Sequence, residues 1–174
     1  MNRFETARQK YKPQQIDYLL VAETPPKSDS NRFFYFENVD KQDSLFLETM
    51  KLLYPNETEF VETKEIRRRK KKFLHKFCSD GFYLIDSLDK PFEERYSSNE
   101  KVRLIKQGQN ELLGKIKNLL SENTKVILIA SPVYKANFEF LKGQGIPVIN
   151  KEPIDFPGSG GQKKYREKMK RILN

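Results

Sequence analysis

An apolar run near the N-terminus stops at a carboxylate and two prolines: Ile16-Asp17-Tyr18-Leu19-Leu20-Val21-Ala22-Glu23-Thr24-Pro25-Pro26. The consecutive apolar residues Leu19 to Val21 predict a strand that is buried on both faces, as in a parallel sheet. Proline has no amide hydrogen to donate to a sheet ladder, so the strand must end before Pro25. Glu23 is therefore expected just past the carboxyl end of a core strand, which is the edge where open α/β sheets bind ligands.

The rest of the chain alternates between short apolar runs and longer segments with helical periodicity. Further strands are predicted at 82–85, 126–130 and 146–149, and helices at 4–11, 43–53, 64–77, 97–120, 133–141 and 162–172. Ser97 and Glu100 form a capping-box pair where the fourth of these helices begins. Strands that alternate with helices favour a parallel sheet covered on both faces. We therefore predict one α/β domain over residues 1–174, a three-layer α/β/α arrangement around a central, mostly parallel four-stranded sheet.

Composition narrows the partners and the compartment. The chain has 174 residues, a net charge of +9 and one cysteine, Cys78. The positive surplus favours a polyanion, either nucleic acid or an acidic membrane face, although ordinary solubility also explains it. One cysteine excludes an intramolecular disulfide and a cysteine-rich metal site, and it fits a reducing compartment. Because the N-terminus is polar and no apolar run approaches the ~20 residues of a membrane span, we expect a cytoplasmic protein.

Polar groups from distant segments are expected to meet at the carboxyl edge of the sheet. Glu23 follows the first strand, Asp86 the second, Ser131-Pro132 the third and residues 155–161 the fourth. Two carboxylates at one edge can serve as a general base and a substrate reader. The alternative is that Asp86 caps the next turn and Glu23 faces solvent, because acidic residues are common in turns.

A glycine-rich segment precedes the last predicted helix. Ser159, Gly160 and Gly161 lead into it, and Lys163 and Lys164 lie in its first turn. Free backbone N–H groups and the positive end of the helix dipole suit a phosphate, and an anion there would offset the unfavourable placement of two lysines. The alternative is a serine cap with flexible glycines, because the segment lacks the spacing of a P-loop or a dinucleotide fingerprint.

Two further segments have both a functional and a structural interpretation. The basic run 67–72, with Arg68 and Arg69, either contacts phosphates in a salt-dependent manner or is a solvated helix face. The aromatic block 33–36 is expected to place two rings in the core and one at the site, where it can stack on a planar base. The only histidine, His75, lies within a predicted helix, so nucleophilic Ser–His or Cys–His chemistry is poorly supported.

The order of these segments resembles the uracil-DNA glycosylase superfamily. Ala22-Glu23-Thr24-Pro25-Pro26 is similar to its first motif, which has forms such as Gly-Gln-Asp-Pro-Tyr or Gly-Glu-Ala-Pro-Gly. Gly81-Phe82-Tyr83-Leu84-Ile85-Asp86 is similar to its strand Gly-Val-Leu-Leu-Leu-Asn. The last motif, His-Pro-Ser-Pro-Leu-Ser, corresponds to Phe156-Pro157-Gly158-Ser159-Gly160-Gly161.

The resemblance implies a role for each matching residue. Glu23 would activate or position the attacking water, Pro25 would line the base pocket, and Phe34 or its neighbour Tyr35 would stack on the flipped base. Asp86 stands where the family has a base-reading Asn. An ionised Asp only accepts hydrogen bonds, so it suits the exocyclic amine of a cytosine- or adenine-like edge rather than O4 of uracil.

Other departures from the family affect the chemistry. Phe156 replaces the family histidine that supports the developing charge on the base oxygen. The single cysteine excludes the four-cysteine iron–sulfur cluster of one branch. No cofactor and no metal are therefore expected.

The resemblance thus implies a monomeric DNA-acting glycosylase of altered base specificity, with DNA and not a membrane as its partner. Two alternatives stay open. One is a non-catalytic nucleic-acid-binding module on the same fold, which the missing histidine supports. The other is an α/β enzyme for a small nucleotide or phosphate ester, with Ser159 to Gly161 as its anion site.

Overall fold

Three parallel strands form the centre of the protein, whose computed structural model describes residues 1–174. They are β1 (Tyr18–Ala22), β2 (Phe82–Asp86) and β3 (Lys125–Leu128), in the order β2-β1-β3. The central strand β1 pairs in parallel with both neighbours, and Leu19 to Val21 at its middle are 0% exposed. The predicted parallel sheet with a doubly buried first strand is confirmed.

The prediction of a fourth strand at 146–149 is wrong. That region contributes only isolated parallel bridges at the β3 edge, one between Val126 and Val148 and one between Ile129 and Ile154. A proline, Pro147 or Pro153, stands directly before each bridging residue. Because proline cannot donate to a ladder, neither bridge extends into a strand.

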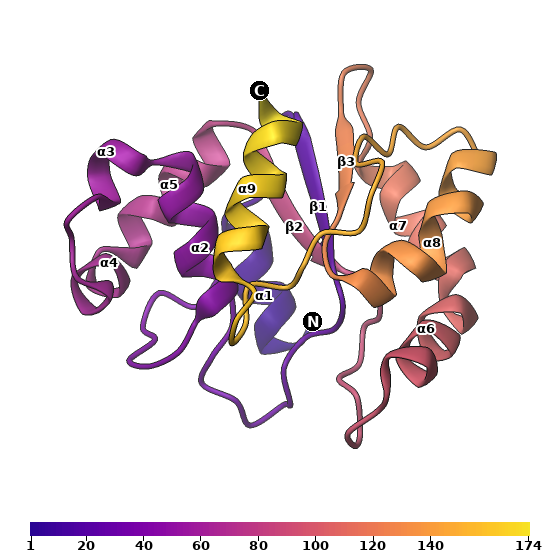
Figure 1. Ribbon diagram of the computed structural model, residues 1–174, viewed down its shortest axis with the longest axis horizontal. Coiled ribbons are helices and arrows are strands. Elements are labelled where there is room, and N and C mark those ends of the chain that lie inside the picture. Colours follow the sequence, from indigo (N-terminus) through magenta and orange to yellow (C-terminus); the bar gives the residue numbers. More distant parts are fainter.

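Nine helices surround the sheet. They are α1 (Arg3–Lys10), α2 (Ser44–Leu53), α3 (Pro55–Thr58), α4 (Thr63–Arg68), α5 (Lys70–Ser79), α6 (Ser98–Gln107), α7 (Gln109–Leu119), α8 (Ser131–Gly143) and α9 (Gln162–Leu173). Figure 1 shows α3, α4 and α5 at one end of the molecule and α6 and α8 at the other, with α9 crossing in front of β1 and β2. None of these helices combines the length and the apolar character that crossing a membrane requires.

Two predicted helices are each divided in the structure. The segment 97–120 divides at Gly108, where the backbone leaves the helical conformation and the side chain of Leu88 packs so closely that a Cβ atom would lie 2.6 Å from its Cδ2. The segment 64–77 breaks at Arg69, whose backbone is not helical. The predicted capping box at the start of α6 is confirmed, with Ser97 and Glu100 each bonded to the other's backbone N–H.

The carboxyl ends of the strands meet at one edge of the molecule, the lower edge in Figure 1. The N-terminus, the segment that follows β1, the start of α8 and the start of α9 all lie toward this edge. The aromatic block 33–36 also follows β1, but it forms turns rather than a strand. The ends of β1 and β2, where Glu23 and Asp86 lie, and the segments that lead into α8 and α9 are therefore on the same side of the molecule.

Candidate functional site

Glu23 directly follows β1 and Asp86 is the last residue of β2, and the structure shows that these two strands are neighbours in the sheet. Asp86 pairs with Ala22 in the ladder between β1 and β2. The pairing continues past the strands, because the Ser87 amide donates to the Ala22 carbonyl at 2.8 Å and the Leu88 amide donates to the Glu23 carbonyl at 3.2 Å. The two chain segments therefore leave the sheet side by side at its carboxyl edge, where ligands bind in open α/β folds.

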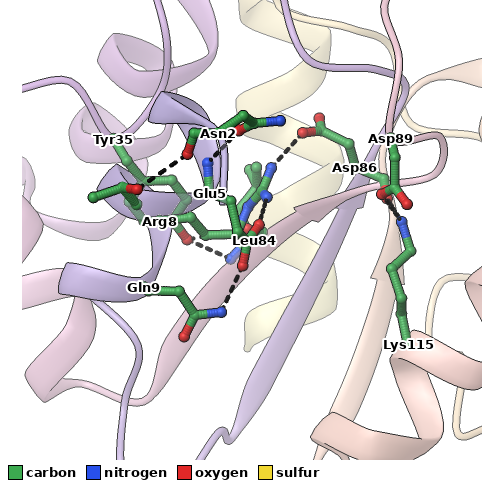
Figure 2. Close-up of polar contacts among 10 residues, drawn as sticks. Asn2, Glu5, Arg8, Gln9, Tyr35, Leu84, Asp86, Asp89 and Lys115 are labelled. Carbon is green, nitrogen blue, oxygen red and sulfur yellow. Dashed lines mark hydrogen bonds and ion pairs between the residues drawn. The ribbon is translucent and has the colours of Figure 1, made fainter.

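Asp86 is buried and held by an arginine from the N-terminal helix. Asp86 is 6% exposed, and its Oδ2 accepts a hydrogen bond from Nη2 of Arg8 at 2.5 Å. Arg8 also pairs with Glu5, one turn earlier on α1. Figure 2 shows Arg8 reaching from α1 toward Asp86 at the end of β2. The pair links the leading helix to the carboxyl edge of the sheet.

A lysine from α7 completes this charged cluster. Lys115 Nζ donates to the backbone carbonyl of Asp86 at 3.0 Å and to Oδ1 of Asp89 at 2.7 Å. The helices α1 and α7, the end of β2 and the loop after it thus contribute charges to one small region, as Figure 2 shows. Opposite charges alternate within the cluster, so each buried charge has a partner.

Burial and these partners set the ionisation of the pair. Burial raises the pKa of Asp86 to about 6, although the charges of Arg8 and Lys115 lower it. Burial on its own lowers the pKa of Arg8, but the charges of Asp86 and Glu5 more than offset that effect, so the guanidinium stays charged. A carboxyl that titrates near neutral pH inside a cavity is a typical feature of functional sites.

The charged cluster opens into a cavity of about 410 Å³, which we call the Asp86 cavity. Its wall includes Phe4, Arg8, Pro25, Asp86, Leu88 and Lys115. A smaller hollow of about 200 Å³ adjoins it and shares Arg8, Asp86 and Lys115. The size and the mixed lining fit a small planar ligand with polar edges. The structure thus brings two of the predicted base-pocket residues, Pro25 and Asp86, to one cavity.

Glu23 lies beside the Asp86 cavity rather than in its wall. The Oε2 atom of Glu23 is 3.4 Å from Nζ of Lys101 on α6, and its side chain is 22% exposed. The two carboxylates at the carboxyl edge are therefore each held by a different cation. Their side chains follow adjacent strands but do not face a single enclosed space.

The aromatic block lies in the core instead of at the cavity. Phe34 is 6% exposed, and its ring packs against Tyr35, Phe46 and Phe77. The Tyr35 hydroxyl accepts from the Leu84 amide at 2.7 Å and donates to the Leu84 carbonyl at 3.2 Å. Neither ring lines the Asp86 cavity, so neither presents a face to a ligand there. Large aromatic side chains bury the most apolar area, which favours the core for adjacent rings.

The glycine-rich loop is a separate feature of the same edge. Gly161 precedes α9 without any side-chain cap, so the serine-cap alternative is wrong, and Gly160 has a positive φ of 79° that favours glycine. Ser159 is exposed, and Lys163 and Lys164 are exposed in the first turn of α9. None of these residues lines the Asp86 cavity.

The basic run divides between solvent and core. Arg68 is exposed and pairs with Glu65 within α4, and Arg69 is partly buried. Lys70 is 0% exposed, and its Nζ donates to Oδ2 of Asp43 at 2.7 Å and to the carbonyl of Phe33 at 3.0 Å. The run is therefore a solvated helix face only in part, and none of it lines the Asp86 cavity.

The remaining candidates have structural surroundings. His75 is exposed on α5, where its ring meets the edge of Tyr11 with centroids 5.1 Å apart. Cys78 is a free thiol whose pKa is raised by burial. The structure contains no group of three or more His, Cys, Asp or Glu side chains arranged to hold a metal ion.

Sequence reasoning missed the three cations of the site. Arg8, Lys101 and Lys115 lie on helices that the sequence predicts, but nothing local pairs them with the carboxylates at the strand ends. The available signal is weak: Phe4 in α1 and Tyr11 directly after it are apolar and buried, which indicates that this helix docks on the core and carries Arg8 with it.

The fold and the site define an α/β protein with a parallel sheet and a charged cavity at its carboxyl edge. Comparison with models of protein families, with curated proteins and with solved structures finds no match.

Proposed function

We propose that this protein is a DNA-acting, uracil-DNA glycosylase-like protein that takes an extruded base into the Asp86 cavity. The observation that carries the proposal is the position of Asp86: a buried carboxyl at the end of β2, in the wall of a cavity at the carboxyl edge, bonded to Arg8. The net charge of +9 supports nucleic acid as the partner, and the lone cysteine supports a cytoplasmic location. In this proposal the protein is a three-layer α/β/α domain that acts as a monomer.

The recognition chemistry follows from the free oxygen of Asp86. Oδ2 is bonded to Arg8, whereas Oδ1 has no hydrogen-bond partner within the protein. An ionised carboxylate accepts but does not donate, so Oδ1 suits the exocyclic amine of a cytosine- or adenine-like edge. Arg8 favours the ionised form of Asp86 and so favours bases with an amino group.

Glu23 is the proposed group for the chemical step. It follows β1, the strand next to the one that ends in Asp86, and its Oε2 lies 3.4 Å from Nζ of Lys101. In the proposed reaction Glu23 orients a water for attack at C1′ of the sugar, the bond from C1′ to the base nitrogen breaks, and the base leaves with that electron pair. The water proton passes to Glu23, the departing base takes up a proton from solvent water, and Glu23 later returns its proton to solvent, so that one water is consumed for each base released.

A second candidate is a non-catalytic nucleic-acid-binding module. Three observations favour it: Phe156 in the place of the family histidine is 49% exposed, Phe34 is enclosed in the core, and Glu23 lies outside the cavity wall. This candidate predicts binding that weakens with salt but never releases a base. Its phosphate contacts would come from Arg68, Arg69, Lys163 and Lys164, together with Ser159, Gly160 and Gly161 before α9.

The test is a base-release assay on oligonucleotides in single-stranded and duplex form that carry alkylated adenine or cytosine, which keep an exocyclic amine, or uracil, hypoxanthine or xanthine, which lack one. Abasic sites produced by the wild type and lost in Glu23→Ala support the glycosylase, with the exposed Glu122→Ala as the matched control. Tight binding without release by the wild type assigns the non-catalytic module. Tight binding of a free mononucleotide with no affinity for any oligonucleotide contradicts both candidates and supports the small-nucleotide enzyme.

A further inference from the structure

A further hollow lies along the segment that follows β2. This outer groove has a volume of about 660 Å³, and its wall includes Leu88, Phe92, Tyr96, Leu104 and Gly108. Leu88 and Asp89 line both the outer groove and the Asp86 cavity. The two hollows are therefore neighbours, separated only by the short segment that begins at Leu88.

Two aromatic side chains of the outer groove remain accessible. Phe92 and Tyr96 are only partly buried, and their rings meet edge to face with centroids 5.7 Å apart. The aromatic block after β1 differs in this respect, because Phe34 and Tyr35 are enclosed. A partly exposed ring in the wall of a groove can stack on a planar base of any identity.

Lys101 connects the outer groove to the proposed catalytic carboxylate. Its Nζ lies 5.5 Å from the centre of the Phe92 ring and 3.4 Å from Oε2 of Glu23. A cation over an aromatic face orients both groups. The ring of Phe92 therefore stands close to the end of β1, next to the position where the sugar of an extruded nucleotide is proposed to lie.

The start of this segment is held in place on two sides. The Leu88 amide donates to the Glu23 carbonyl at 3.2 Å, and the Leu88 side chain occupies the space that a Cβ atom at Gly108 would need. These two contacts fix the start of the loop that carries Phe92. A binding site that is ordered before its ligand arrives loses less entropy on binding.

The charges of the outer groove select a base rather than a phosphate. Its wall carries the carboxylates of Asp89, Glu93 and Glu111, and Lys90 is the only cation among its lining residues. Asp89 is paired with Lys115, but a phosphate inside the groove would be repelled by the carboxylates of Glu93 and Glu111, whereas an uncharged base is not. The sugar–phosphate backbone would then lie outside the groove, near Lys101.

We propose that Phe92, with Tyr96 at its edge, stacks on the base next to the one that enters the Asp86 cavity. This inference rests on the proposed function and adds a second subsite to it. Because a base is free to stack only when its pairing is broken, the subsite favours single-stranded or locally opened DNA.

The experiment compares the affinities of variants for a 12-nucleotide single-stranded DNA and for the matching duplex by fluorescence anisotropy. Phe92→Ala is expected to weaken single-strand binding by about tenfold, and Phe92→Trp to restore it. The matched control is Phe60→Ala, because Phe60 is 98% exposed between α3 and α4, at the opposite end of the molecule from α6. Its affinity is expected to equal that of the wild type.

A second readout separates stacking from a loss of structure or of charge. The slope of affinity against salt is expected to be the same for Phe92→Ala and the wild type, because a stacked base releases no counterions. Equal affinities of Phe92→Ala and Phe60→Ala, while the wild type binds, overturn the stacking subsite and leave the proposed function standing. Failure of the wild type to bind any oligonucleotide overturns both. In a further outcome, Phe92→Ala binds DNA as the wild type does but no longer captures a tetra-arginine peptide that the wild type captures. This outcome overturns the stacking subsite in favour of a basic protein partner.

Discussion

The Nη2 atom of Arg8 donates to Oδ2 of Asp86 at 2.5 Å, a contact between side chains that are 78 residues apart in the sequence. The two side chains are 12% and 7% exposed, so the pair is shielded from solvent. A buried ion pair is costly to break from one side, because the remaining charge is left without a partner. This contact therefore ties the N-terminal helix to the candidate site and sets the state of its central carboxyl.

Replacing Arg8 tests whether the pair stabilises the fold. Arg8→Met is expected to lower the free energy of unfolding by about 3 kcal/mol at pH 8, because an ionised Asp86 then lacks its counter-charge. The loss should be smaller at pH 5, where Asp86 is protonated. Urea unfolding at both pH values measures it, with the exposed Arg103→Met as the control. Equal losses at the two pH values would contradict the pairing.

The pKa of Asp86 predicts a pH dependence with a definite sign. In the folded protein this pKa is about 6, above the value of about 3.9 for an unfolded chain, so the folded state binds more protons between these values. The stability that Asp86 contributes is fully present below pH 4 and is lost as the pH rises through 6.

The measurement subtracts the free energy of unfolding of Asp86→Asn from that of the wild type between pH 4 and pH 7. The difference is expected to fall by about 2 kcal/mol over this range, because the Asn variant does not titrate. A difference that stays flat or rises with pH would show that Asp86 has an ordinary or a lowered pKa.

Lys70 provides a separate test of the basic run. Its side chain is 0% exposed and bonded to Asp43, so Lys70→Met should lower the free energy of unfolding by about 3–5 kcal/mol. Its exposed neighbour gives the control, because Lys71→Met should change stability by less than about 0.5 kcal/mol. Thermal or urea unfolding of the two variants measures both changes. Similar free energies of unfolding for Lys70→Met and Lys71→Met would contradict the burial of Lys70.

The first turn of α9 is expected to contact phosphate. Lys164→Ala should weaken oligonucleotide binding at low salt and reduce the slope of log affinity against log salt by about 1. Lys151→Ala, an exposed lysine before the glycine-rich loop, is the comparison and should leave the slope unchanged. An unaltered slope in Lys164→Ala would remove α9 from the DNA-binding surface.

The sequence predicts the strands well because their signal is local. Leu19 to Val21 are consecutive apolar residues before two prolines, and the structure buries them completely. The fourth strand fails for a reason that is also local, since Pro147 and Pro153 limit the pairing to single bridges. Gly108 lies within a strong helical pattern that does not predict a break, whereas the structure divides the segment into two helices there.

The candidate site is less predictable because its contacts are long-range. Glu23 and Asp86 are found from their places after apolar runs, but Arg8 is an ordinary polar residue of a short helix until the fold brings it to Asp86. The basic run that contains Lys70 is predicted to contact phosphates or to form a solvated helix face, whereas Lys70 itself is buried against Asp43. Whether Phe34 lies in the core or at the site likewise depends on its packing against residues that are distant in the sequence, which a local stretch of sequence does not show.

The most direct test of the account asks whether a base leaves the helix at the Asp86 cavity. A duplex with 2-aminopurine at its centre reports this, because the fluorescence of this adenine-like base rises when it leaves the stack. Saturating wild-type protein is expected to raise the fluorescence several-fold, and Asp86→Ala, at matched occupancy of the duplex, is expected to abolish most of the rise. Saturable binding of the wild type with no change in fluorescence would contradict base extrusion, and an equal rise in Asp86→Ala would contradict recognition by Asp86.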